Sequence, residues 1–230
     1  MSGKKPLIIG HRGTMGTEAE NTDASFQKAV DMGADGVEFD VHLTSDRVPV
    51  VIHDECLDRT TEGTGKIKNK KLRDLEEYDI LTLGETLDIV RNCKIINIEI
   101  KNGPVFYPGI EEVVIDIVKN RDLSGKVILS SFNHYTIKKI KDLDPALNCG
   151  LLYMAGLFRP WEYARMLGAK SIHPYHLSIT PEIISQCQNN DLQVTLFGAN
   201  KEKMIKRAAK SGADMLITDY PEKALNLLDK

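Results

Sequence analysis

The sequence lacks three features that would each point to a particular class of protein. No apolar run approaches the ~18 residues that a membrane-spanning helix needs, so we expect no stable insertion into a membrane. A basic surplus is also missing: Lys and Arg together number 30, against 33 Asp and Glu, and the formal net charge is -3. Because nucleic-acid-binding domains concentrate basic residues, this balance argues against a nucleic-acid partner.

Clustered cysteines are the third missing feature. The four cysteines, Cys56, Cys93, Cys149 and Cys187, are scattered and show no spacing typical of a metal site. We expect them to be reduced and mostly structural. The first residues, Met1 to Lys5, lack the apolar core of a signal peptide. Together these observations predict a cytoplasmic protein.

Short apolar runs alternate with helical patterns from one end of the chain to the other. This alternation favours a (β/α)8 TIM barrel that forms a single domain over residues 1–230. The main alternative, a doubly wound open sheet, usually carries a Gly-rich phosphate loop after its first strand, and Gly10-His11-Arg12-Gly13 does not match that motif. The expected strands are Leu7–Ile9, Val37–Val41, Ile95–Ile100, Val127–Leu129, Gly150–Tyr153, Ser171–His173, Leu192–Phe197 and Met215–Ile217. The expected helices are Thr22–Met32, Gly84–Arg91, Gly109–Asn120, Tyr135–Leu143, Pro160–Leu167, Pro181–Asn190, Lys201–Ser211 and Pro221–Leu228.

One stretch interrupts the alternation. Residues 55–82 begin with a polar run from Asp58 to Gly65 and continue through a lysine-rich part to Leu72 and Leu75. The segment is too polar at its start for a core and too long for an ordinary βα loop. We interpret it as a small cap segment, inserted after the second strand, that covers part of the substrate; a flexible surface excursion is the alternative.

Two carboxylates stand two residues apart in the second expected strand. A strand places residues i and i+2 on the same face, so Glu38 and Asp40 should point together into whatever that strand lines. Two like charges held close need a cation, a shared proton or strong hydrogen bonds. The third expected strand ends in Glu99-Ile100-Lys101 and adds a third carboxylate. Because carboxylates are hard oxygen ligands, we expect Glu38, Asp40 and Glu99 to bind a divalent cation, Mg²⁺ or Ca²⁺.

Groups suited to phosphate-ester chemistry follow neighbouring strands. In a TIM barrel the carboxyl ends of the strands and the loops after them form the active site. His11 and His53 could transfer protons near neutral pH, since histidine titrates near pH ~6.5. Arg12 and Lys101 could neutralise phosphate oxygens. The chain thus places an acid and base pair, two cations and three carboxylates at one mouth.

Each of these residues also has a structural alternative. A lone histidine after a strand is more often a hydrogen-bonded structural group, and we favour that role for His42. Glu99 and Lys101 could form a simple buried ion pair. It is the joint placement of the whole set that favours a functional site.

At these residues the chain resembles the glycerophosphodiester phosphodiesterase family. Its motifs occur here in order as His11-Arg12-Gly13, Glu20-Asn21-Thr22, Glu38-Phe39-Asp40, His53-Asp54 and Glu99-Ile100-Lys101. Further matches are Asp58-Arg59-Thr60-Thr61, Ser130-Ser131-Phe132 and Ile217-Thr218-Asp219-Tyr220-Pro221. Two positions depart from the family pattern: Ala19 stands where members usually have proline, and Phe197 where many carry tryptophan. Both departures bear on the preferred alcohol more than on the chemistry.

The resemblance implies a barrel with a small inserted cap and metal-dependent hydrolysis of a glycerophosphodiester to sn-glycerol 3-phosphate and an alcohol. His11 and His53 would be the catalytic acid and base, and Glu38, Asp40 and Glu99 would bind the cation. Asp54 could orient a neighbouring group. The residues that would contact or support the substrate are Arg12, Lys101, Glu20, Asn21 and Phe197.

Two other functions are weighed against this one. A lysophospholipase D-type lipid diesterase would use the same groups on a longer substrate, with residues 157–161 as an apolar edge for an acyl chain. Such a segment more often packs a helix against the barrel. A phosphate-ester-binding protein without catalysis is disfavoured, because a binder has no need for two proton-transfer groups. The sequence makes no prediction about the oligomeric state.

Overall fold

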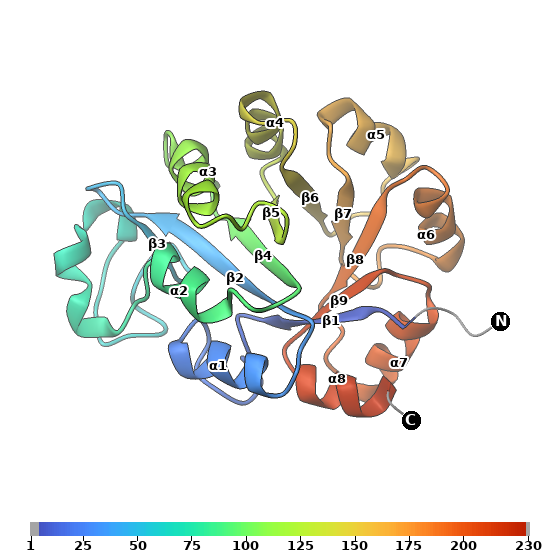
Figure 1. Ribbon diagram of the computed structural model, residues 1–230, viewed down its shortest axis with the longest axis horizontal. Coiled ribbons are helices and arrows are strands. Elements are labelled where there is room, and N and C mark those ends of the chain that lie inside the picture. Colours follow the sequence, from blue (N-terminus) through green and yellow to red (C-terminus); the bar gives the residue numbers. More distant parts are fainter. Residues whose placement is uncertain (1–4, 229–230) are drawn as a thin grey trace.

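Eight parallel strands pair side by side and close into a ring in the computed structural model, which describes residues 5–228 (Figure 1). Because β1 pairs with both β2 and β9, the sheet has no open edge there and forms a barrel. The predicted (β/α)8 TIM barrel is confirmed, and the alternative of a doubly wound open sheet is wrong. The barrel strands are β1 (Leu7–His11), β2 (Gly36–Leu43), β4 (Ile95–Ile100), β5 (Val127–Ser131), β6 (Asn148–Tyr153), β7 (Ser171–Pro174), β8 (Gln193–Phe197) and β9 (Met215–Thr218).

One α-helix follows each barrel strand and packs outside the ring (Figure 1). Several helices begin at residues whose side chains cap free backbone N–H groups: Thr22 accepts from Ser25, and Thr82 forms a capping box with Glu85. The helices are α1 (Asp23–Asp31), α2 (Leu83–Val90), α3 (Ile110–Asn120), α4 (His134–Leu143), α5 (Pro160–Leu167), α6 (Pro181–Gln188), α7 (Glu202–Lys210) and α8 (Pro221–Leu228).

The two faces of each barrel strand meet different surroundings. Outward-facing side chains such as Phe39 pack against the helices and form the main core, where Phe39 and Phe26 meet edge-on at 5.6 Å between ring centroids. A second, smaller apolar cluster consists of Ile9, Ile128, Met215 and Ile217. His11, at the end of β1, and Asp219, directly after β9, stand two positions beyond Ile9 and Ile217 of this cluster and lie at the barrel mouth.

Residues 55–82 have a small apolar core of their own. The strand β3 (Pro49–Val51) pairs antiparallel with β2 and leads into three short 3-10 turns, η1 (Ile67–Asn69), η2 (Leu72–Asp74) and η3 (Glu76–Tyr78). Buried Leu57, Ile67 and Leu75 pack together with residues from the β3 end. This apolar cluster distinguishes the segment from a loose surface excursion.

None of the helices within residues 5–228 combines the length and the apolar character that crossing a bilayer requires.

A histidine is buried among the strands of the barrel. His173 on β7 is fully shielded from solvent, and its Nε2 lies 3.0 Å from Ser171 Oγ. Gly150 on the neighbouring strand leaves room for the ring, because a Cβ at that position would lie 2.4 Å from Nε2. Burial lowers the pKa of His173 to about 3. The ring is therefore neutral at any pH at which the protein is expected to work.

Replacing His173 with Gln should remove a proton linkage from the folding equilibrium. In an unfolded chain histidine takes up a proton below pH ~6.5, whereas the buried ring resists protonation until about pH 3. The unfolded state binds more protons in this window, so the free energy of unfolding falls as the pH falls, by up to ~1.4 kcal/mol per pH unit from this group. Urea unfolding at several pH values inside the window should show a shallower dependence for H173Q. Equal slopes for H173Q and the wild type would contradict the assignment.

Candidate active site

A tight turn after β1 brings His11 and Arg12 to the barrel mouth. Arg12 and Gly13 both adopt positive φ, 49° and 83°. A Cβ on Gly10 would lie 2.1 Å from the Gly13 carbonyl oxygen, so only glycine fits there. Ser25 on α1 stabilises the turn by donating to the Arg12 carbonyl at 2.9 Å. In the His-Arg-Gly motif, the glycine therefore provides the backbone conformation of the turn, and the histidine and arginine provide side chains for the site.

Strand register places the three carboxylates next to one another. Glu38 on β2 is the register partner of His11 on β1, and Asp40 is the register partner of Glu99 on β4. All three carboxylates are buried, and one oxygen from each lies within 4.8 Å of the others. The i, i+2 spacing in β2 and the pairing with β4 therefore create one compact acidic cluster.

Two cations and an amide compensate the charge of Asp40. The ammonium of Lys101 lies 3.0 Å from Asp40 Oδ1 and 2.5 Å from Glu99 Oε1. Arg12 Nε lies 3.2 Å from Asp40 Oδ2, and Asn21 donates to the same oxygen at 3.1 Å. Burial alone would favour the neutral acid, but Lys101 and Arg12 hold the pKa of Asp40 well below its usual range.

The other two carboxylates are less well compensated, although Glu99 shares Lys101 with Asp40. Burial, together with the charge of Asp40, raises the pKa of Glu38 to about 8. Burial also raises the pKa of Glu99, although Lys101 acts in the opposite direction. In addition, Asp40 Oδ1 is buried without a hydrogen-bond donor of suitable geometry. Three buried hard-oxygen ligands that cannot all ionise without more positive charge suit a divalent cation.

His11 is held by a carboxylate that directly follows the last barrel strand. A carboxylate only accepts, so His11 Nδ1 donates to Asp219 Oδ1, at 2.6 Å, while Nε2 lies 3.8 Å from Glu38 Oε2. Burial lowers the pKa of His11, but Asp219 and Glu38 outweigh it, and the pKa is raised overall. Asp219 in turn accepts from the Asn200 side chain. The motif Thr218-Asp219 marked this position in the sequence but did not indicate its role.

His53 is held in the same way by its neighbour in the chain. His53 Nδ1 donates to Asp54 Oδ1 at 2.6 Å, which gives Asp54 the orienting role expected of it. The backbone carbonyl of His53 accepts from His42 Nε2 at 2.9 Å, and His42 Nδ1 contacts the Tyr107 hydroxyl at 2.8 Å. Burial lowers the pKa of His42 to about 4, so this ring is a neutral structural group.

An arginine of the 55–82 segment links that segment to the β1–α1 loop. Arg59 donates to Asp54 at 2.7 Å and to both carboxylate oxygens of Glu20, at 2.7 and 2.8 Å. Arg12 donates to the same Glu20 at 2.8 Å. The hydrogen bond from Arg59 lowers the pKa of Asp54 to about 2. Glu20 therefore holds two arginines, and the importance of Arg59 was not predicted from the sequence.

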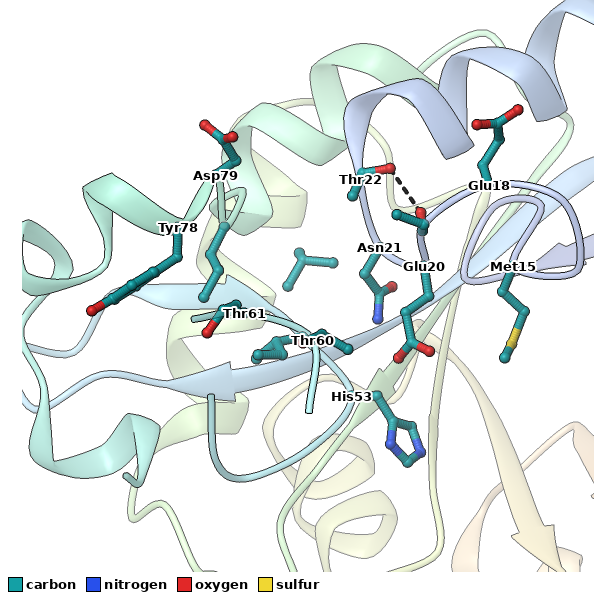
Figure 2. A pocket seen from close by; sticks show the side chains of 14 residues that line it. Met15, Glu18, Glu20, Asn21, Thr22, His53, Thr60, Thr61, Tyr78 and Asp79 are labelled. Carbon is teal, nitrogen blue, oxygen red and sulfur yellow. Dashed lines mark hydrogen bonds between the residues drawn. The ribbon is translucent and has the colours of Figure 1, made fainter. Parts of the chain in front are cut away.

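Two cavities meet at these residues. The catalytic pocket, of about 160 Å³, is lined by His11, His53, Glu38, Glu99 and Lys101, and its apolar wall includes Phe197 and Phe132 in edge-on contact. A neighbouring cavity of about 310 Å³ lies between the β1–α1 loop and the 55–82 segment. Figure 2 shows Glu20 and Asn21 pointing toward His53 in that second cavity, with Thr60 and Thr61 opposite.

The structure brings most of the predicted site residues to one pocket. Asp40 is buried in contact with the two cations and is not among the residues that line the pocket. Glu20 and Asn21 line the neighbouring cavity instead, where they support Arg12 and Asp40. The predicted residues that line the catalytic pocket itself are His11, Arg12, Glu38, His53, Glu99, Lys101 and Phe197.

Comparisons with known proteins agree with this geometry. A model of the glycerophosphoryl diester phosphodiesterase family matches residues 11–223. A glycerophosphodiester phosphodiesterase from Caldanaerobacter subterraneus subsp. tengcongensis is 40% identical and aligns with 98% of this chain and 99% of its own length. An Oleispira antarctica phosphodiesterase, solved in complex with the product sn-glycerol-3-phosphate, is 29% identical with a TM-score of 0.87, covering 98% of each chain.

A Thermotoga maritima glycerophosphodiester phosphodiesterase is also similar in structure, with 27% identity, a TM-score of 0.83 and coverage of 97% of this chain and 99% of its own. The matches extend over nearly the whole chain, at both the sequence and the fold level. The motifs at the barrel mouth had predicted the same relationship. The chain therefore belongs to the glycerophosphodiester phosphodiesterase family and is an enzyme of that class.

Proposed function

We propose that the protein hydrolyses glycerophosphodiesters to sn-glycerol 3-phosphate and an alcohol, with Mg²⁺ or Ca²⁺ held by Glu38, Asp40 and Glu99. His11 and His53 carry out the proton transfers. The observation that supports this most directly is that both imidazoles line the same pocket as Glu38 and Glu99, two of the three carboxylates of the cluster. The product bound to the Oleispira antarctica relative, sn-glycerol-3-phosphate, supports the substrate class.

The carboxylate cluster and the side chains of Lys101 and Arg12 stabilise the charge of the phosphate in different ways. A divalent cation bound there supplies positive charge that stabilises negative charge developing on a phosphate oxygen. Lys101 and Arg12 keep Asp40 ionised, as a metal ligand must be. Both also line the pocket, where they neutralise non-bridging phosphate oxygens.

The two histidines have matching arrangements. Asp219 accepts from Nδ1 of His11 and Asp54 accepts from Nδ1 of His53, so each Nε2 is left for the substrate. A carboxylate behind an imidazole fixes its tautomer and stabilises the imidazolium that forms when Nε2 takes a proton. One histidine activates the nucleophile and the other protonates the leaving alkoxide. The nucleophile is water or a substrate hydroxyl that first forms a cyclic phosphate, and labelling with ¹⁸O-water distinguishes the two.

A lysophospholipid is the second candidate substrate. The observation in its favour is the apolar wall of the catalytic pocket, formed by Phe132, Leu152, Phe197 and Ile217. A cavity of about 450 Å³ lies beside Leu157, Phe158 and Trp161, in the segment that could offer an apolar edge to an acyl chain, although helix packing is the preferred interpretation of that segment. Glycerophosphocholine remains the preferred candidate substrate, because the catalytic pocket, of about 160 Å³, is small for a substrate that carries an acyl chain.

We also propose a cytoplasmic location. All four cysteines are free, and Cys93, Cys149 and Cys187 are buried. Thiols that stay unpaired are typical of a reducing compartment.

Removing the cation should abolish turnover. We expect EDTA to lower sn-glycerol 3-phosphate release from glycerophosphocholine by at least ~100-fold, because charge stabilisation at phosphorus is lost, and Mg²⁺ or Ca²⁺ to restore it. The same cation should raise the melting temperature of the wild type but not of E38Q, which removes one ligand. Lysophosphatidylcholine assayed in parallel decides between the two substrates. Full activity after chelation would rule out the metal role.

Each histidine should contribute to the rate in a different way. H11Q and H53Q should each lower kcat by roughly 10²- to 10⁴-fold while remaining folded by circular dichroism. A diester with a 4-nitrophenolate leaving group does not need protonation of that group. The variant that lacks the general acid should therefore hydrolyse this substrate at close to the wild-type rate, whereas the variant that lacks the general base should remain slow. A near-normal rate for either variant on glycerophosphocholine would exclude that histidine.

Asp219 should act through His11. In D219N the acceptor for Nδ1–H becomes a neutral amide, so we expect the pKa of His11 to fall, because Asp219 raises it in the wild type. The value of kcat should fall by roughly tenfold or more, as expected when a catalytic imidazole loses its carboxylate. NMR titration of the His11 ring protons measures the pKa, and an unchanged His11 pKa would show that the contact has no electrostatic effect.

A further inference from the structure

A cavity of about 390 Å³ separates α6 from α7 on the outside of the barrel, over β8. Figure 1 shows these helices as neighbours along the ring. Other consecutive pairs, such as α5 with α6 and α7 with α8, pack directly, whereas α6 and α7 have at most marginal contact. No residue lines both this cavity and the catalytic pocket. We call it the α6–α7 cavity.

One wall of the α6–α7 cavity is strongly basic. Four cations from α7 line it at positions i, i+3, i+4 and i+7, which share one face of a helix, and no carboxylate is among the lining residues. Lys206 pairs with Glu202 at 2.6 Å. The other three, Lys203, Arg207 and Lys210, form no ion pair within residues 5–228. These three side chains are exposed at the mouth of the cavity, and in a chain of net charge -3 such a local group of cations would favour an anionic occupant.

A buried histidine forms part of the same lining. His176, in the β7–α6 loop, is only 4% exposed, and neither ring nitrogen has a hydrogen-bond partner among the described residues. Buried polar atoms of this kind are rare and call for an explanation. Burial and the nearby charge of Arg207 lower the pKa of His176, so the neutral ring offers one donor and one acceptor.

The remaining wall is apolar. Ile184 of α6, Leu196 of β8 and Ala208 of α7 line the cavity together with Ile179 and Pro181. A bare inorganic ion would leave this surface in contact with water, whereas a ligand with a short hydrocarbon part would cover it. The volume lies within the range of small-molecule sites, ~300–1,000 Å³.

We propose that the α6–α7 cavity is a second binding site, for a small organic anion that carries a phosphate or carboxylate head group on a short alkyl body. Lys203, Arg207 and Lys210 hold the head group, and arginine can do so with two parallel hydrogen bonds. The alkyl part packs on Ile184 and Leu196. A polar atom near the head group completes the hydrogen bonding of His176.

The site shares a strand with the catalytic pocket. Leu196 of β8 faces the α6–α7 cavity, and the next residue, Phe197, lines the catalytic pocket. The backbone N–H of His176 donates to the Phe197 carbonyl at 3.1 Å. Binding in the α6–α7 cavity does not require hydrolysis, so a binding measurement tests the proposed site whatever the outcome of the activity assays.

NMR titration of the ¹⁵N-labelled chain with four probes tests the proposal. Butyl phosphate and butyrate carry both required features, inorganic phosphate lacks the alkyl part, and 1-butanol lacks the charge. We expect saturable shifts of the His176, Ile184 and Ala208 amides with at least one of the first two probes, about tenfold tighter than with the last two. The tighter binder of butyl phosphate and butyrate identifies the preferred head group. Equal affinity for inorganic phosphate or 1-butanol, or no shifts at these amides, would overturn the proposal.

Charge-matched variants identify the cations responsible. R207E/K210E should weaken binding of the tighter probe by at least ~tenfold, whereas K68E/K170E, which changes the net charge equally at exposed lysines elsewhere, should bind as the wild type does. If charge reversal impairs folding, R207Q/K210Q replaces it.

H176F should also weaken binding while raising the melting temperature, because it removes two unpartnered buried nitrogens. Wild-type affinity in R207E/K210E or R207Q/K210Q would refute the site, and in H176F it would refute the role of His176.

Discussion

Three carboxylates buried side by side are the constraint on which the rest of this site depends. The register of β2 with β4 leaves Glu38, Asp40 and Glu99 no way to separate. Lys101 and Arg12 lower the pKa of Asp40, whereas burial raises the pKa values of Glu38 and Glu99, so the three carboxylates need further positive charge to ionise together. The protein retains an arrangement that costs stability, and such arrangements are typical of functional sites.

The same constraint explains why the residues around the cluster are so closely tied together. Arg12 can reach Asp40 only because the turn at Gly13 reverses the chain directly after β1. Glu20 then holds Arg12 and Arg59 together, so the 55–82 segment is linked to the carboxylates through two arginines. A displacement of that segment would therefore change the contacts of Glu20, which also holds Arg12 beside Asp40.

The parts of this arrangement that could be predicted from the sequence are those with a local signal. Strand and helix alternation identified the barrel, and i, i+2 spacing placed Glu38 with Asp40 and Glu99 with Lys101. Contacts between distant segments had no such signal: Asp219 lies 208 residues from His11 in the sequence, and Arg59 lies 39 residues from Glu20. The basic face of α7 also had no such signal, because spacing alone does not reveal whether the neighbouring helix packs against it.

Strand alternation also explains how one barrel can carry two sites without conflict. Along β8, Phe197 faces the catalytic pocket while Leu196 faces the helices. The inward positions must accommodate charge and substrate, whereas the outward positions need only apolar packing, and a gap between α6 and α7 leaves part of that packing unfilled. Because protein interiors are close-packed, a ligand that filled this gap would contact Leu196, whose neighbour Phe197 forms part of the wall of the catalytic pocket. A strand with one face in each cavity is therefore the shortest physical route by which either site could influence the other.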